Sequence, residues 1–226
     1  MSPSLQLISV SKTFPSGSTE RNIYKRLLLP QKRTPRKVIF ENLNLSIGSG
    51  EVVALVGPNG TGKTTILKLI AGLAFADRGS ITIEGKPHYR FDRGRIGVVF
   101  SNDMLYSGLT GFQNLEYSAH LFRCENPQHA VNEAIDEWGM RSYIDLTVSG
   151  YSAGMRSRLA LARGTLHRPT LLLLDEPTVF LDVDGLERLH QNLRRSRATA
   201  IVRTHQPDLL ATDRVVEIGQ LCARDN

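Results

Sequence analysis

The chain has 226 residues, a length that suits one domain with a proper hydrophobic core. Its composition, 41% hydrophobic and 22% charged, is ordinary for a globular protein. The two cysteines, Cys124 and Cys222, show neither metal-ligand spacing nor a disulfide framework, which favours a reducing compartment. The first ten residues lack a signal-peptide pattern, and no stretch approaches the ~20 apolar residues of a membrane span. A role at a membrane would therefore be a role at its surface.

The net charge of +6 comes from one segment. Ser11–Lys37 holds eight Lys or Arg and a single Glu, which makes it +7. The remainder, with 20 basic and 21 acidic residues, is −1. The basicity is therefore a local feature and not a property of the whole fold.

The order of apolar patterns along the chain predicts an α/β fold. Strands that alternate apolar and polar residues are expected at 5–14, 38–47 and 79–85. Continuous apolar runs predict strands buried on both faces at 50–57 and 171–177. Further strands are expected at 95–100, 199–205 and 214–219. The expected helices are 63–73, 114–122 and 129–137, with a short one at 21–29 inside an irregular segment.

The stretch "GPNGTGKTT" predicts a phosphate-binding loop. Glycines let the backbone N–H groups converge on phosphate oxygens, and the helix that follows adds its positive end. Lys63 would reach the outer phosphates, and the Thr64 hydroxyl would bind Mg²⁺. The residues expected at the nucleotide are Gly57, Pro58, Asn59, Gly60, Thr61, Gly62, Lys63, Thr64 and Thr65.

Two carboxylates end the second buried strand. Asp175 and Glu176 follow Leu171–Leu174 directly and so lie at the carboxyl edge of the sheet, where open α/β folds bind ligands. Asp175 suits a Mg²⁺ contact, and Glu176 suits polarising a water for in-line attack on a γ-phosphate. The alternative is that Asp175 and Glu176 are ordinary acidic residues at a helix N-terminus, where acidic residues followed by a proline, here Pro177, are common.

The motifs "GPNGTGKTT", "YSAGMRSRLALARGTLHRPTLLLLDEPTVFLD" and "VRTH", in that order, resemble the nucleotide-binding subunit of an ABC transporter. The resemblance covers about residues 5–221, apart from 15–37. It implies one P-loop NTPase domain, 1–226, with a RecA-like parallel sheet, a small antiparallel β-subdomain and a helical subdomain at about 101–155. It also implies ATP and Mg²⁺ as ligands.

The resemblance assigns further residues. Ser152 and Gly154 match the signature motif, which would contact the γ-phosphate held by the other subunit of a head-to-tail homodimer. Asp182 matches the aspartate of the loop that crosses the dimer interface, and His205 matches the switch histidine near the γ-phosphate. Glu176, His205 and Lys63 would carry the catalysis. Phe14 is expected to stack on adenine; Tyr24 and Phe40 are rivals, and strand-end packing is the bland alternative.

One position departs from the family pattern. Where the family usually has a glutamine that touches Mg²⁺ or its water, this chain has Ser101, which can still hold a metal-bound water. The combination of "FSND", "LTGFQNLEY" and "YSAGM" resembles bacterial exporters of polysaccharides, lipid-linked glycans and amphipathic compounds.

The basic insert, 15–37, would lie against an anionic leaflet or the cytoplasmic end of a permease. A solvated loop is the alternative, and nucleic-acid binding has thinner support.

The implied function is ATP hydrolysis that drives export through a separate membrane permease, with the chain peripheral on the cytoplasmic side of the inner membrane. Two other readings stay open: a soluble ABC-type ATPase acting on nucleic acid or ribosomes, and a regulatory nucleotide sensor.

Overall fold

The computed structural model describes residues 4–15, 36–100 and 104–221. Its centre is a parallel sheet with the strand order β6-β7-β8-β3-β9. These strands are β3 (Val52–Val56), β6 (Ile96–Val99), β7 (Leu171–Asp175), β8 (Thr199–Arg203) and β9 (Arg214–Glu217). A second, antiparallel sheet has the order β2-β1-β4-β5. Its strands are β1 (Leu5–Pro15), β2 (Arg36–Ile47), β4 (Arg78–Ile83) and β5 (Lys86–Pro87).

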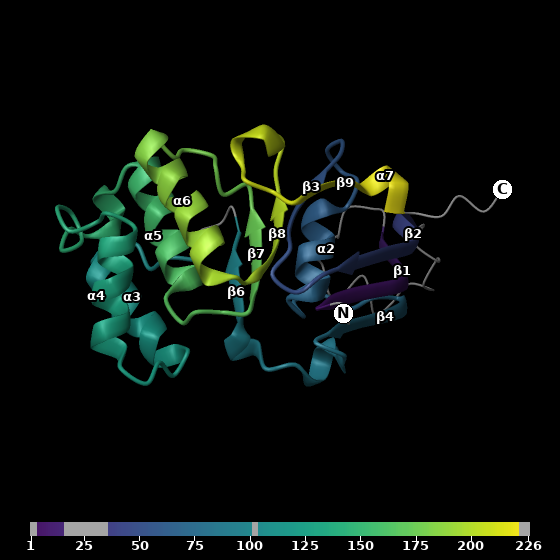
Figure 1. Cartoon of the computed structure of the whole chain (residues 1–226), viewed down its shortest axis with the longest axis horizontal. Helices are drawn as coiled ribbons and strands as arrows, with labels where there is room; N and C mark the ends of the chain where they lie inside the picture. Colours follow the sequence, from purple (N-terminus) through teal and green to yellow (C-terminus); the bar gives the residue numbers. More distant parts are fainter. Residues whose placement is uncertain (1–3, 16–35, 101–103, 222–226) are drawn as a thin grey trace, which may run out of the picture.

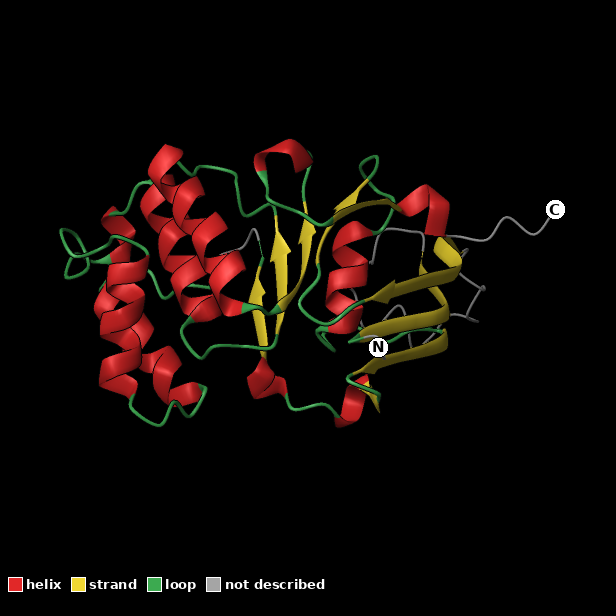
Figure 2. Cartoon of the chain, viewed as in Figure 1, coloured by secondary structure: helices red, strands yellow, loops and turns green. Residues whose placement is uncertain are grey.

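The helices cover the two sides of the parallel sheet (Figure 1). α2 (Lys63–Ile70) lies between this sheet and the antiparallel one, and the other long helices gather at the opposite end of the molecule (Figure 2). Those helices are α3 (Gly111–Leu121), α4 (Pro127–Glu137), α5 (Ala153–Thr165) and α6 (Val183–Ser196). A short α7 (Ile218–Leu221) follows β9, and single 3-10 turns are η1 (His88–Arg90), η2 (Arg93–Arg95), η3 (Val148–Gly150) and η4 (Pro207–Leu209).

Strand β7 shows how the sequence builds two cores around one sheet. All five of its residues are buried, and successive side chains of a strand point to opposite faces. Leu171 and Leu173 therefore enter the core formed with α2 and the antiparallel sheet. Leu172 and Leu174 enter the core formed with the helices α3 to α6. A run of four leucines is what a strand between two layers needs.

The predicted α/β fold, with a parallel core, an antiparallel subdomain and helices, is confirmed. The helix expected at 63–73 ends earlier, at Ile70, because Gly72 takes a left-handed conformation (φ 71°) that stops it. Helix α6 was not expected at all from the sequence. The expected helical subdomain, 101–155, contains α3 and α4, whereas α5 begins at Ala153 and runs on past that boundary to Thr165.

Among the described residues, no helix has the length and apolar character needed to cross a bilayer. Most of the basic insert, residues 16–35, lies outside the described residues, as do Ser101 and the short helix expected at 21–29.

Candidate functional site

The predicted phosphate-binding loop joins β3 to α2. Three of its glycines have positive φ: Gly57 (140°), Gly60 (81°) and Gly62 (95°). Residues other than glycine rarely adopt such backbone angles, so this loop shape requires glycine at these three positions. Gly62 is the N-cap of α2, and no side chain caps this helix end. The first N–H groups of α2 are therefore available to an anion.

Lys63 is folded back over the loop that precedes it. Its ammonium donates to the backbone carbonyls of Gly57 and Pro58, the latter at 2.6 Å. The residue is only 3% exposed, and burial lowers the pKa of Lys63, with the positive charge of Arg203 adding to the effect. This poorly hydrated ammonium belongs to the first residue of α2, whose N-terminus has no side-chain cap, so it is well placed for a phosphate oxygen that binds there.

The carboxylates predicted from "LLLLDEP" lie beside this loop. The Thr64 hydroxyl donates to Asp175 Oδ2 at 3.1 Å, across 111 positions of sequence. Asp175 is 3% exposed and is the last residue of β7. The structure thus brings together two of the three protein groups that the sequence assigned to Mg²⁺, and the third, Ser101, lies outside the described residues.

Glu176 and His205 face each other at the same edge of the sheet. His205 Nε2 lies 3.2 Å from Glu176 Oε1, and the His205 backbone N–H donates to Glu176 Oε2 at 3.3 Å. Glu176 has a left-handed backbone (φ 53°), which is strained for a glutamate and re-aims its side chain after the strand. Oε1 is a buried atom without a hydrogen bond of good geometry among the described residues, which leaves this oxygen with unused capacity to accept.

Arg203 is a site residue that sequence reasoning missed. It ends β8 and is paired in register with Asp175 of β7. Its Nη1 donates to Asp175 Oδ1 at 2.8 Å, and its Nη2 lies 3.7 Å from Glu176 Oε1 and 3.3 Å from His205 Nε2. The sequence does contain one signal for Arg203, because this charged residue directly follows the apolar run "TAIV". The carboxyl ends of neighbouring parallel strands meet at one edge of the sheet, so a charged residue there is expected near Asp175.

A second group of predicted residues lies at the starts of α5 and α6, two helices that are on the other side of the sheet from α2 (Figure 1). Ser152 is the N-cap of α5, where its hydroxyl accepts from the Met155 N–H at 3.2 Å. A Cβ on Gly154 would lie 3.0 Å from the carbonyl oxygen of Phe180. Asp182 caps α6 by accepting from the Gly185 N–H at 2.9 Å, and this bond, followed by the Arg158 guanidinium, lowers the pKa of Asp182. These residues do not join Lys63 and Asp175 within one chain.

The three aromatic residues that could stack on adenine differ in how exposed they are and in whether the structure describes them. Phe14 is 41% exposed, with the Lys12 ammonium 5.0 Å from its ring centre. Phe40 is 3% exposed and packs behind Gly62, where it has no free face for a base. Tyr24 lies outside the described residues. Phe14 stays the prediction that the described residues favour.

The residues fit a magnesium ion that arrives with a nucleotide. Among the described residues, no group of three or more His, Cys, Asp or Glu side chains could hold a metal by itself. Mg²⁺ typically takes one or two protein oxygens and completes its shell with phosphates and water. Thr64 and Asp175 supply such a pair, so the donor set suits Mg²⁺ with ATP and not a resident ion.

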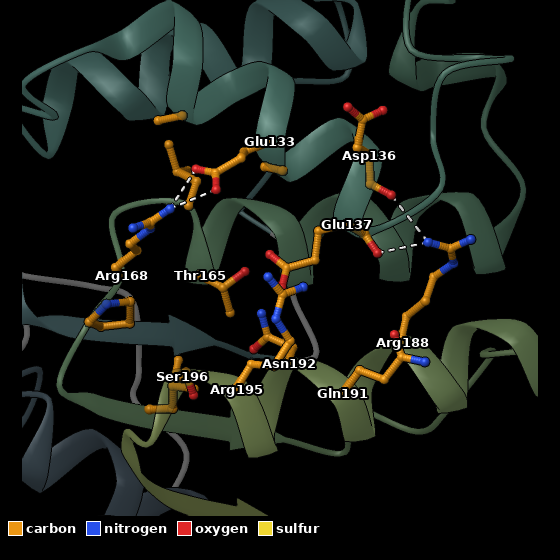
Figure 3. A pocket seen from close by; sticks show the side chains of 15 residues that line it. Glu133, Asp136, Glu137, Thr165, Arg168, Arg188, Gln191, Asn192, Arg195 and Ser196 are labelled. Carbon is orange, nitrogen blue, oxygen red and sulfur yellow. Dashed lines mark hydrogen bonds and ion pairs between the residues drawn. The ribbon is translucent and has the colours of Figure 1, made fainter.

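A cavity of about 690 Å³ lies elsewhere, between α4, the end of α5 and α6 (Figure 3). Two of its arginines already have partners: Arg168 donates to the Glu133 carboxylate at 2.6 and 2.7 Å, and Arg188 donates to the backbone carbonyls of Asp136 and Glu137. None of the predicted nucleotide-site residues lines it. Its position beside the amino end of β7 places it at the edge of the sheet away from Asp175, so it is not the candidate site.

Comparison with known proteins identifies the family. The model of the ABC transporter family matches residues 40–179. The chain is 35% identical over 199 residues to the uncharacterized ABC transporter ATP-binding protein YdbJ of Bacillus subtilis, covering 85% of this chain and 62% of that protein. It is 36% identical to the Nod factor export ATP-binding protein I of Sinorhizobium fredii (83% and 55% covered). It is 32% identical to the spermidine/putrescine import ATP-binding protein PotA of Spiroplasma citri (82% and 56%). The chain thus spans less than two thirds of each of these relatives.

A solved structure agrees with the fold. The chain superposes on the ATP-binding cassette MJ0796, solved as a dimer in a post-hydrolysis state bound to ADP and Pi, with a TM-score of 0.78. That match has 24% sequence identity and covers 95% of this chain and 94% of the other. Such a likeness establishes the shared fold and nothing finer. The family match over residues 40–179 shows that this chain belongs to the ABC transporter family, in which the relatives named above are ATP-binding proteins.

Proposed function

We propose that this chain is the ATP-hydrolysing subunit of an ABC transporter and that a separate membrane permease carries the cargo. One observation supports this most directly. The 57–65 loop, the Thr64–Asp175 contact and the Glu176–His205 pair converge at the carboxyl edge of one parallel sheet. Phosphate binding, metal binding and water activation are the three tasks of phosphoryl transfer to water, and each has a group here.

The 57–65 loop and Lys63 would bind the phosphates of the nucleotide. The N–H groups around Gly57, Gly60 and Gly62 would hold the phosphates together with the open end of α2. Lys63 would turn its ammonium from the carbonyls of Gly57 and Pro58 to the outer phosphates. Phe14 would stack on adenine at the exposed end of β1.

Hydrolysis falls to Glu176. A water oxygen would bond to the γ-phosphorus while the bond to the oxygen bridging the β-phosphate breaks, which releases ADP and phosphate. Glu176, whose buried Oε1 has unused capacity to accept a hydrogen bond, would accept the proton of that water. His205 would keep Glu176 oriented and contact the γ-phosphate. Mg²⁺, when bound by Thr64, Asp175 and a water on Ser101, would offset charge on the phosphoryl oxygens.

A second copy of the chain would complete each site. Ser152 and Gly154 lie at the exposed start of α5, away from Lys63 in the same chain, so they would meet the γ-phosphate held by a partner copy. Asp182, at the start of α6, would line the same interface. In such a head-to-tail homodimer two ATP molecules lie between two chains. The dimeric form in which the related cassette was solved supports this arrangement.

The permease and the membrane surface are the proposed partners. The chain would be peripheral, on the cytoplasmic side of the inner membrane, with the basic insert 15–37 facing the anionic leaflet or the permease. No nucleic-acid partner is proposed.

For the cargo, we propose export of a polysaccharide, lipid-linked glycan or other amphiphile. The motifs around Ser101 and Ser152 and the resemblance to an export protein support this, but the similarity to an import protein means that family membership alone does not decide it. A drug-like amphipathic compound is the second candidate.

The first test is ATP hydrolysis by the purified chain, with and without Mg²⁺. We expect phosphate release that EDTA abolishes. Binding of ATP without release would favour the nucleotide sensor instead.

The second test is a mild-detergent pull-down of tagged Glu176→Gln protein from membranes. A polytopic membrane protein is expected, and recovery of ribosomes, nucleic acid or soluble proteins alone would favour the soluble ATPase.

A further inference from the structure

Arg203 places a permanent positive charge among the carboxylates of the site. Its guanidinium forks between two partners: Nη1 donates to Asp175 Oδ1 at 2.8 Å, and Nη2 lies 3.7 Å from Glu176 Oε1. The same Nη2 lies 3.3 Å from His205 Nε2. Arginine stays charged at any physiological pH, so this cation is present whether or not a metal is bound.

The Arg203–Asp175 pair is largely removed from water. The side chain of Arg203 is 18% exposed and that of Asp175 is 2% exposed. A charge-assisted hydrogen bond that is shielded in this way is stronger than a surface ion pair. The register of β7 and β8 pairs the two residues directly, so the backbone itself holds Arg203 against Asp175.

Both oxygens of Asp175 are occupied in the described structure. Oδ2 accepts from the Thr64 hydroxyl, and Oδ1 accepts from Arg203. The remaining guanidinium donor, Arg203 Nε, is buried and has no hydrogen-bond partner among the described residues. A cation that gains an oxygen of Asp175 must therefore compete with a built-in cation, and Arg203 has an unused donor with which to re-pair.

We propose that Arg203 is a positioning residue that serves as the counter-ion of Asp175 and Glu176 in the nucleotide-free protein and thereby sets how much Mg²⁺ the site needs. This inference rests on the proposed function. It has two consequences of opposite sign. Arg203 raises the Mg²⁺ concentration needed for half-saturation of nucleotide binding. It also supports binding of nucleotide without metal, because it supplies positive charge near the phosphates.

The test is a binding measurement, not a turnover measurement. A fluorescent, non-hydrolysable ATP analogue is titrated with Mg²⁺ against the wild type, Arg203→Gln, Arg203→Lys and the control Arg95→Gln. The control makes the same change of charge at a surface ion pair with Glu84, at the amino end of β6. The melting temperature of each nucleotide-free protein is measured alongside.

We expect Arg203→Gln to lower the Mg²⁺ midpoint by roughly tenfold, the equivalent of losing one hydrogen bond to a charged group at the low end of its usual strength. It should also weaken binding of the analogue in EDTA. Arg203→Lys keeps the charge, so its Mg²⁺ midpoint should stay within about threefold of the wild-type value. The midpoint of the control Arg95→Gln should equal that of the wild type.

An unchanged midpoint in Arg203→Gln, or a lower melting temperature as its only effect, would overturn the inference and leave the proposed function intact. If the wild type fails to bind the analogue with Mg²⁺, the proposed function fails as well. A test on the wild type alone covers the case of a misfolded variant. The nucleotide-free wild type should bind no Mn²⁺ at the Mn²⁺ concentrations that saturate the nucleotide-bound protein. Mn²⁺ binding by the nucleotide-free protein would contradict the role of Arg203.

Discussion

At the scale of single residues, His167 is the clearest case of a titratable group held in one protonation state. Its ring stacks on Phe122 with 3.9 Å between the ring centres, and Nε2 lies 3.3 Å from the carbonyl oxygen of Ile96. Nδ1 is buried without a partner among the described residues. Burial lowers the pKa of His167 to about 4 from an ordinary value of 6.5.

This shift predicts a loss of stability in mild acid. Between about pH 6.5 and pH 4 the unfolded chain binds a proton at His167 that the folded chain does not, so the free energy of unfolding falls as the pH falls. The full shift corresponds to about 3 kcal/mol. In urea unfolding at pH 7.5, 6 and 5, His167→Phe should lose stability less steeply than the wild type. The control His120→Gln, at an exposed position, should follow the wild type. Parallel curves for His167→Phe and the wild type would show that His167 is not the group responsible.

At the scale of elements, the junction between the phosphate loop and α2 depends on a glycine. Gly62 has φ 95°, and a Cβ there would lie 2.4 Å from Ile39 Cγ2 and 2.9 Å from Phe40 Cδ1. Strand β2 therefore packs against bare backbone, and any side chain would push the loop away from it.

We predict that Gly62→Ala destabilises the fold by at least about 1–2 kcal/mol, the cost of a left-handed residue, before the clash with β2 is added. Because the loop must shift, nucleotide binding should weaken by at least roughly tenfold. Thermal unfolding and titration with a fluorescent nucleotide measure the two effects. Gly108→Ala is the control, because Gly108 has no positive φ and a Cβ there meets nothing within 4 Å. Wild-type affinity in Gly62→Ala would show that the loop shape is not required.

Strands were easier to predict than helices, for a physical reason. Continuous apolar runs such as those of β3 and β7 have few alternatives to burial between two layers. Helix α6 was missed because most of its surface is polar. Its buried positions include Leu189 and Leu193, one turn apart, and its start is marked by the N-cap Asp182. That aspartate was assigned only to the dimer interface, although the structure also gives it this capping role.

The candidate site was predictable in its composition but not in its geometry. The motifs supplied Lys63, Asp175 and Glu176, whose functional roles remain proposals. The fold-back of Lys63 onto its own loop depends on three-dimensional contacts. Arg203 was missed because its meaning comes from the register of β7 and β8, which the order of strands along the chain does not give.

At the scale of the whole molecule, the parallel sheet separates α2, which follows the phosphate loop, from α5, which begins directly after Ser152 (Figure 1). Ser152, at the start of α5, currently caps its own helix through the Met155 N–H. If that helix end meets the γ-phosphate of a partner copy, a negative charge there should prevent dimerisation without harming the helix. Aspartate caps a helix as well as serine does, and the helix dipole favours it.

We therefore predict that Ser152→Asp keeps the wild-type melting temperature but loses ATP-dependent dimerisation, because its carboxylate would repel the phosphates. Light scattering after size exclusion, in the Glu176→Gln background with ATP and Mg²⁺, measures the association. Thr110→Asp is the control, since Thr110 caps α3 in the same manner and should leave dimerisation unchanged. A Ser152→Asp protein that still dimerises with ATP would place the interface elsewhere.

The most direct test of the central claim is the rate of phosphate release from ATP by the wild type and by Glu176→Gln, with nucleotide binding measured on the same samples. Glu187→Gln, on the exposed face of α6, serves as a control of equal chemistry. The account predicts Mg²⁺-dependent hydrolysis by the wild type and the control. It predicts unchanged ATP binding and a rate at least roughly a hundredfold lower in Glu176→Gln, the size of effect expected for a general base. Hydrolysis by Glu176→Gln at the wild-type rate would contradict the account.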